Sequence, residues 1–216
     1  TGSGQQVDLA YVASAANQAT GLTGLDTTAT VTITGDPTNA ASLLIIQADD
    51  LNDIAAIVST VVQIDSSATS ISGTYTEVHN ALTASKTQAD ANDATGVATP
   101  TIASLQSLAV ELTDATVTLA EYEDIQNNYT TGVITATIAA SAIATLLDET
   151  GTVTGAGVND LVSGNAFSVS VTDDSLTAAN LAELVGMTSG TITLTHTGAA
   201  TFPTITGSVA DLVTIA

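Results

Sequence analysis

The sequence predicts an α/β protein in which short, mostly parallel, Thr-rich strands alternate with short helices in an elongated, solenoid-like repeat. Three observations predict this class. Residues 167–171 alternate apolar and polar side chains, a period of two that is typical of a strand with one buried face. Residues 178–185 place apolar side chains at i, i+3, i+4 and i+7, which is one stripe of a helix. Residues 191–196 alternate again, so 166–198 is a strand–helix–strand unit that favours parallel pairing.

Weaker copies of this unit account for most of the chain. We expect strands at 29–35, 68–73, 115–119, 132–138, 152–154, 166–172, 190–196 and 203–206. We expect helices at 7–19, 75–82, 99–112, 122–125, 143–147, 158–162, 178–185 and 209–212. The stretch 37–62 is ambiguous: Leu43–Ile46 has the pattern of a short buried strand, and a helix is expected after Asp49 and Asp50.

Two features indicate a repeat. A four-residue pattern recurs at 48–51, 158–161, 178–181 and 209–212. It consists of a small residue, any residue, Asp or Asn, and then Leu. The strand starts at 115, 132, 151, 166 and 190 are spaced by 17, 19, 15 and 24 residues, close to one turn of an α/β solenoid. Residues 86–98 are the most polar stretch, so we expect two regions, 1–98 and 99–216, which can also form one continuous solenoid.

These strands and helix starts resemble the Thr- and Ala-rich repeats of very large bacterial surface proteins, cyanobacterial ones in particular. Those proteins are similar to adhesins and surface-layer proteins. The resemblance is carried by T-V-T-I-T strands and by A-D-D-L and V-A-D-L helix starts, over 26–65 and 113–216. It implies extracellular structural or adhesive work and brings no catalytic residues. The stretch 66–112 departs from it because it is more helical and less periodic.

Composition narrows the function classes. Lys and Arg total 1 against 22 Asp and Glu, for a net charge of −21, so we expect no nucleic-acid partner. No apolar run approaches the length of a membrane-spanning helix, so we expect no membrane insertion. An acidic, Lys-poor surface fits an extracellular or cell-surface location.

We predict that the protein is not an enzyme. The two histidines, His79 and His196, lie far apart in sequence, and no nucleophile elbow accompanies them. Each is interpreted as a satisfied core or surface side chain.

Calcium is the one cofactor that the residues suggest. The pairs Asp49–Asp50 and Asp173–Asp174 offer carboxylate oxygens, the ligands that Ca²⁺ prefers, and they are the candidate metal ligands. The alternative is favoured: these acids cap helices, with Asp173, Asp174 and Ser175 before the helix at 178–185.

We therefore predict a structural protein that forms a homo-oligomer or polymer, a filament or a surface layer, through head-to-tail or edge-to-edge packing. The alternative is a module of a large adhesin or phage fibre that binds glycans or a cell surface. A calcium-dependent surface-layer domain is a third hypothesis. The outward Thr rows at 30–34 and 191–195 fit ordinary strand propensity, or a hydroxyl surface for such a partner.

Overall fold

The structure is a computed structural model that describes residues 31–33, 44–66, 68–87, 95–97, 99–147, 161–195 and 203–207. The chain divides into two compact units. The first comprises Thr1–Thr113 with Asn128–Gly132, and the second comprises Asp114–Asn127 with Val133–Ala216. The predicted boundary between residues 98 and 99 falls inside the first unit. The elements expected at 7–19, 152–154 and 209–212 lie outside the described residues.

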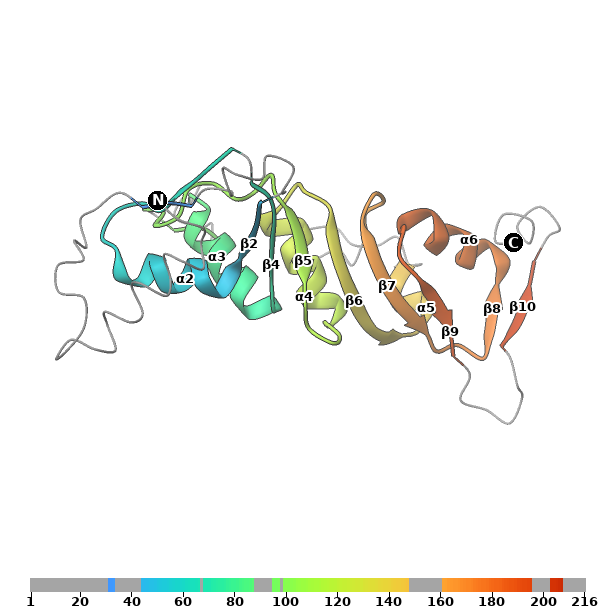
Figure 1. Cartoon of the computed structure of the whole chain (residues 1–216). Helices are drawn as coiled ribbons and strands as arrows, with labels where there is room; N and C mark the ends of the chain where they lie inside the picture. The colour runs from blue at the N-terminus through green and yellow to red at the C-terminus, as the bar shows by residue number, and fades with distance from the viewer. Residues whose placement is uncertain are drawn as a thin grey trace. The chain divides into compact units, whose positions relative to one another are not determined.

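The first unit combines parallel strands with two helices (Figure 1). Its elements are β1 (Thr32–Ile33), β2 (Leu44–Gln47), α2 (Ala48–Ile57), β3 (Gln63–Ile64), β4 (Ala68–Gly73), α3 (Tyr75–Ser85) and β5 (Ala109–Leu112). Strands β2, β4 and β5 pair in that order, in parallel. Helices α2 and α3 contact each other and these strands. The strand option for residues 43–46, the helix after Asp50, and the strand and helix predicted at 68–82 are confirmed.

The first unit contains a second set of parallel backbone pairs besides that of β2, β4 and β5. Strand β1 pairs with β3 in parallel, and Val62, just before β3, bridges Ile102 in parallel. In the sequence, β2 follows β1, β4 follows β3, and β5 follows Ile102. Parallel pairing of this kind needs a crossover between neighbouring strands, and α2 and α3 lie in the crossovers.

The second unit is also built on parallel strands. Its elements are α4 (Leu119–Asp124), a π-helical turn (Ile125–Tyr129) whose last two residues belong to the first unit, β6 (Ile134–Ser141), α5 (Ile143–Leu147), β7 (Ala166–Val171), β8 (Ser175–Thr177), α6 (Ala178–Met187), β9 (Ile192–Leu194) and β10 (Thr204–Thr206). Strands β6, β7 and β9 pair in parallel in that order, and β8 pairs with β10 in parallel. The predicted strand–helix–strand unit at 166–198 is therefore confirmed as β7, α6 and β9.

On strands β6 and β7 one face is buried and the other is exposed to solvent, and β9 continues the same alternation with half-exposed apolar side chains. On β7 the alternate side chains of Phe167, Val169 and Val171 are buried, as are those of Ile134 and Ile138 on β6. The hydroxyl-bearing residues between them point outward. This alternation is the period of two that the sequence shows.

The helix predicted at 99–112 is wrong, because residues 109–112 form β5. Val110 and Leu112 are buried and Glu111 is exposed, which is strand alternation. The apolar positions 102, 105, 108, 109 and 112 fit a helical stripe as well, so periodicity alone could not decide. Ile102 is held by its bridge to Val62, which commits the start of the stretch to parallel pairing.

Three further predictions are corrected. Residues 115–119 hold a single bridge, from Val117 to Ile138, because the side chain of Thr118 begins α4 instead of extending a strand. Ser175 belongs to β8 and does not cap α6; the hydroxyl of Thr177 accepts the cap hydrogen bond from the Asn180 N–H. At the predicted helix 158–162, the described residues 161 and 162 are not helical.

The same three-residue loop leads into β6 and β9. Thr followed two residues later by Gly occurs at only two places in the sequence, 130–132 and 188–190. The Thr130 hydroxyl donates to the Leu108 carbonyl at 3.1 Å, and the Thr188 hydroxyl donates to the Phe167 carbonyl at 2.6 Å. Each also accepts from the Gly N–H, at 2.9 Å in both loops. A Cβ on either Gly would lie 2.0 Å from that same carbonyl oxygen, so only Gly fits.

We therefore expect Gly190→Ala to lower the free energy of unfolding by about 2–3 kcal/mol, because the new methyl group meets backbone that cannot rotate away. Gly186→Ala is the matched control: Gly186 lies within α6 with nothing within 4 Å of an added Cβ. It should raise stability by roughly 0.5–1 kcal/mol, as Gly→Ala does within helices. Urea denaturation followed by circular dichroism measures both. Equal effects of the two substitutions would contradict the close approach.

Candidate functional site

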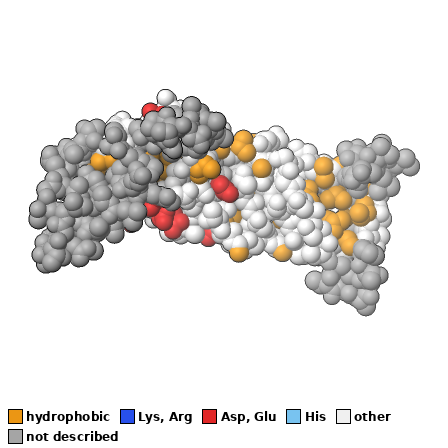
Figure 2. Space-filling model, in the orientation of Figure 1, with side chains coloured by type: hydrophobic (Ala, Val, Ile, Leu, Met, Phe, Trp, Pro, Cys, Tyr) orange, Lys and Arg blue, Asp and Glu red, His pale blue; other side chains and the backbone are white. Residues whose placement is uncertain are grey.

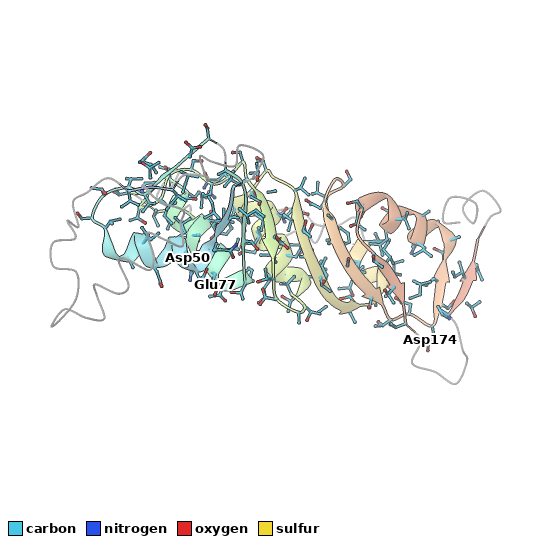
Figure 3. The ribbon with its side chains drawn as sticks, in the orientation of Figure 1. Asp50, Glu77 and Asp174 are labelled. Carbon is cyan, nitrogen blue, oxygen red and sulfur yellow. The ribbon has the colours of Figure 1, made fainter. Side chains whose placement is uncertain are left out.

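Most of the described acidic side chains that the sequence singled out lie at helix starts. Asp49 and Asp50 are in the first turn of α2, as predicted (Figure 3). Figure 3 also shows Glu77, at the start of the neighbouring helix α3. Carboxylates are stabilised there by the unsatisfied N–H groups and the positive end of the helix dipole.

Two helix starts carry a reciprocal cap that the sequence prediction missed. The Thr74 hydroxyl accepts from the Glu77 N–H at 3.4 Å, and the Glu77 carboxylate accepts from the Thr74 N–H at 2.8 Å. Thr118 and Glu121 make the same pair of bonds before α4, at 3.2 and 2.8 Å. The signal was present in the sequence as Thr-x-x-Glu before an apolar residue.

Asp173 caps a helix other than the predicted one. Its carboxylate accepts a 2.6 Å hydrogen bond from the N–H of Ile143, the first residue of α5, 30 residues earlier in the chain. Asp174 lies in the connection from β7 to β8 (Figure 3), and its carbonyl accepts from the Thr204 N–H. The pair therefore ties α5 and β10 to this connection.

The four candidate calcium ligands are divided between the units, Asp49 and Asp50 in the first and Asp173 and Asp174 in the second. Within the described residues, no three His, Asp or Glu side chains gather in a group that could hold a metal ion. Calcium binding by these pairs stays a prediction.

His79 lies between two tyrosine rings in the first unit. Its ring centroid is 5.5 Å from that of Tyr75 and 4.9 Å from that of Tyr129. Lys86, the one Lys of the chain, has its Nζ 5.6 Å from the Tyr129 ring centroid and donates a hydrogen bond to Thr95. The cluster packs a scarce cation against an aromatic face, which stabilises the end of α3. His196 lies outside the described residues.

The second unit contains one fully buried phenol. Tyr122 is 0% exposed, its ring meets Phe167 edge-on at 5.6 Å, and its hydroxyl has no hydrogen-bond partner within the described part of the chain. Desolvation by burial raises the pKa of Tyr122 well above its ordinary value of 10.0.

The end of the second unit forms the surface that best fits a functional site. Strand β9 has a neighbour, β7, on one side only among the described strands, and β10 likewise pairs only with β8. Figure 2 shows apolar side chains gathered over α6, β8 and β9, with no carboxylates on this patch in that view. We call this surface the β9 end and define it by its half-exposed or exposed apolar residues, Val185, Met187, Ile192, Leu194 and Ile205.

The backbone of β9 forms hydrogen bonds to a described strand on one side only. Thr191 accepts from Val169 at 3.0 Å and Thr195 donates to Val171 at 2.8 Å, both on β7. In a parallel ladder alternate residues bond to one neighbour, so the N–H and C=O groups of Ile192 and Leu194 face the other side. The described residues place no strand on that side.

The side chains on β9 are also incompletely covered. Leu194 stands beside Val171 in the register, and Val171 is fully buried, whereas Leu194 and Ile192 are half-exposed. The sequence showed the alternation of this strand but not its position at an edge.

No protein-family model, curated protein or solved structure matches the chain. Among the described helices, none combines the length and the apolar character needed to cross a membrane.

We expect Tyr122→Phe to stabilise the protein by about 1 kcal/mol, because it removes a buried hydroxyl without a partner and keeps the ring contact with Phe167. The native chain should also lose stability as the pH rises above 10.0, since the phenol ionises first in the unfolded state. The loss should approach about 1.4 kcal/mol per pH unit. Denaturant titrations between pH 8 and 11 test this. Identical pH profiles for native chain and variant would contradict it.

Proposed function

We propose that the protein is an extracellular structural subunit that assembles with further copies of itself, into a filament or a surface layer, by adding strands at its open edges. The observation that carries the proposal is the β9 end. A parallel edge whose outer backbone groups face no described strand, and whose apolar side chains are half-exposed, is a template for another strand. Covering it would bury Ile192 and Leu194 to the level of Val169 and Val171.

We further propose that the strands and helices continue as an elongated solenoid. Three features support this: the two sets of parallel backbone pairs in the first unit, the matching loops at 130–132 and 188–190, and the similar helix starts. In a solenoid each turn contacts only its neighbours, so an uncapped terminal turn leaves an apolar layer exposed.

Charge supports both the location and the kind of contact. Copies with a net charge of −21 repel each other, and salt screens the repulsion, so a saline extracellular medium favours association. Residues 187–195 carry no charged side chain, and neither do residues 44–47, so contacts through these strands place no like charges opposite each other.

The alternative function, a glycan-binding module, is favoured by the wet face of the β6–β7–β9 strands. Thr135 and Thr137 on β6 and Thr191 and Thr193 at β9 are exposed, so uncharged hydroxyls stand on the two strands that flank β7. A glycan array probed with monomeric protein tests this alternative. Binding that Thr137→Val with Thr193→Val abolishes, without self-association, would favour it.

We expect Leu194→Asp to weaken self-association at least about a hundredfold, since a carboxylate on the covered face would be buried without a partner. Thr193→Asp adds the same charge on the wet face of the same strand, so it should weaken association less than about tenfold. Analytical ultracentrifugation at high salt, over a range of protein concentrations, measures both.

Circular dichroism checks that each variant keeps the native fold. If the unmodified protein remains monomeric across protein, salt and Ca²⁺ concentrations, the proposed assembly is wrong. If both variants weaken association equally, charge alone is responsible and the β9 end is not the contact.

A further inference from the structure

We infer that the partner of the β9 end is strand β2 of a second copy, in a head-to-tail contact; this rests on the proposed self-assembly. β2 is the counterpart of β9: in the first unit it has β4 on one side and no described strand on the other. Both strands are short and uncharged, Ile192–Leu194 against Leu44–Gln47, so neither opposes a charge to the other.

Two criteria favour this pair over a contact between two β9 ends: the direction of the strands, and the side of the sheet on which their apolar side chains lie. Every described strand pair within either unit is parallel, and the large apolar side chains stand beside one another in the register, as Ile46 beside Ile71 and Ile138 beside Val169. Two β9 strands related by a two-fold axis either run antiparallel or turn opposite faces to the core. In a β9–β2 contact the strands can run parallel while the apolar side chains of both lie on the same side of the sheet.

The alternation on the two edges fixes which side chains meet. Ile46 is 4% exposed and belongs to the covered face of β2, while Ile45, on the other face, is 48% exposed. On β9, Leu194 is on the covered face and Thr193 on the wet face. Registers that match the covered faces therefore place Thr193 opposite Ile45 or Gln47 of the other copy. A shift by one residue would bury Thr193 and expose Leu194.

Cysteine cross-linking tests this contact without background, because the chain contains no Cys. Thr193→Cys protein is mixed with Ile45→Cys or, separately, Gln47→Cys protein, at a salt concentration where the unmodified protein associates. Neighbouring strands lie about 4.8 Å apart, within the range of Cα separations of about 4.4–6.8 Å that disulfides span. Ser170→Cys is the matched control, because Ser170 is a polar residue on β7, an interior strand flanked by β6 and β9.

One of the two mixtures should form disulfide-linked dimers at least about tenfold faster than the Ser170→Cys mixtures, since pairing of the strands raises the local thiol concentration. The mixture that reacts identifies the register between β9 and β2, because it shows whether Thr193 lies opposite Ile45 or Gln47. Thr193→Cys protein that cross-links equally well with itself would overturn the inference in favour of a two-fold contact. Association without preferential cross-linking in either mixture would also overturn it, while leaving self-assembly intact. Monomers under all conditions would instead refute the proposed function on which the inference rests.

Discussion

Parallel backbone pairing is the constraint on which the described structure depends. A parallel strand cannot be joined to its neighbour by a tight turn, so each pass needs a crossover, and the crossovers hold the helices. The loops before β6 and β9 must then approach an earlier segment of backbone, at Leu108 and Phe167, closely enough for the strands to pair. Gly132 and Gly190 permit that approach, and Thr130 and Thr188 fix it with hydrogen bonds. Small residues in the loops are therefore as important to this architecture as the apolar side chains.

The scarcity of cations shapes how the acidic side chains are accommodated. Lys and Arg total 1, so 22 carboxylates cannot be balanced by ion pairs. Several of them accept hydrogen bonds from backbone N–H groups at helix starts instead, locally as Glu77 and Glu121 do, or across 30 residues as Asp173 does. Helices that follow strands at each pass provide many such N–H groups. An acidic composition and a strand–helix architecture thus support each other.

The sequence was most informative where only one period fitted. Residues 166–171 and 178–187 were predictable because alternation and helical spacing are each unambiguous there. Residues 99–112 fit both periods, and the bridge between Ile102 and Val62, which no local pattern reveals, decided for a strand. The long-range cap by Asp173 was unpredictable for the same reason. The Thr118–Glu121 cap could have been found, but the alternation of 115–119 outweighed it. The edge position of β9 is a property of the whole topology.

The strand at the β9 end is uncharged, whereas the chain as a whole carries a net charge of −21. Copies of a protein with a net charge of −21 repel each other, and contacts through uncharged strands add least to that repulsion. Neutral strands at the edges of both units provide such contacts in the proposed assembly, and their N–H and C=O groups that face no described strand would add direction to the contact. In the proposed assembly, contacts that oppose carboxylates are disfavoured, whereas contacts through these two strands oppose none. In the proposed assembly, specificity therefore rests on strand direction and on the alternation of covered and exposed side chains at the two edges, and the absence of charge on both strands removes one source of repulsion.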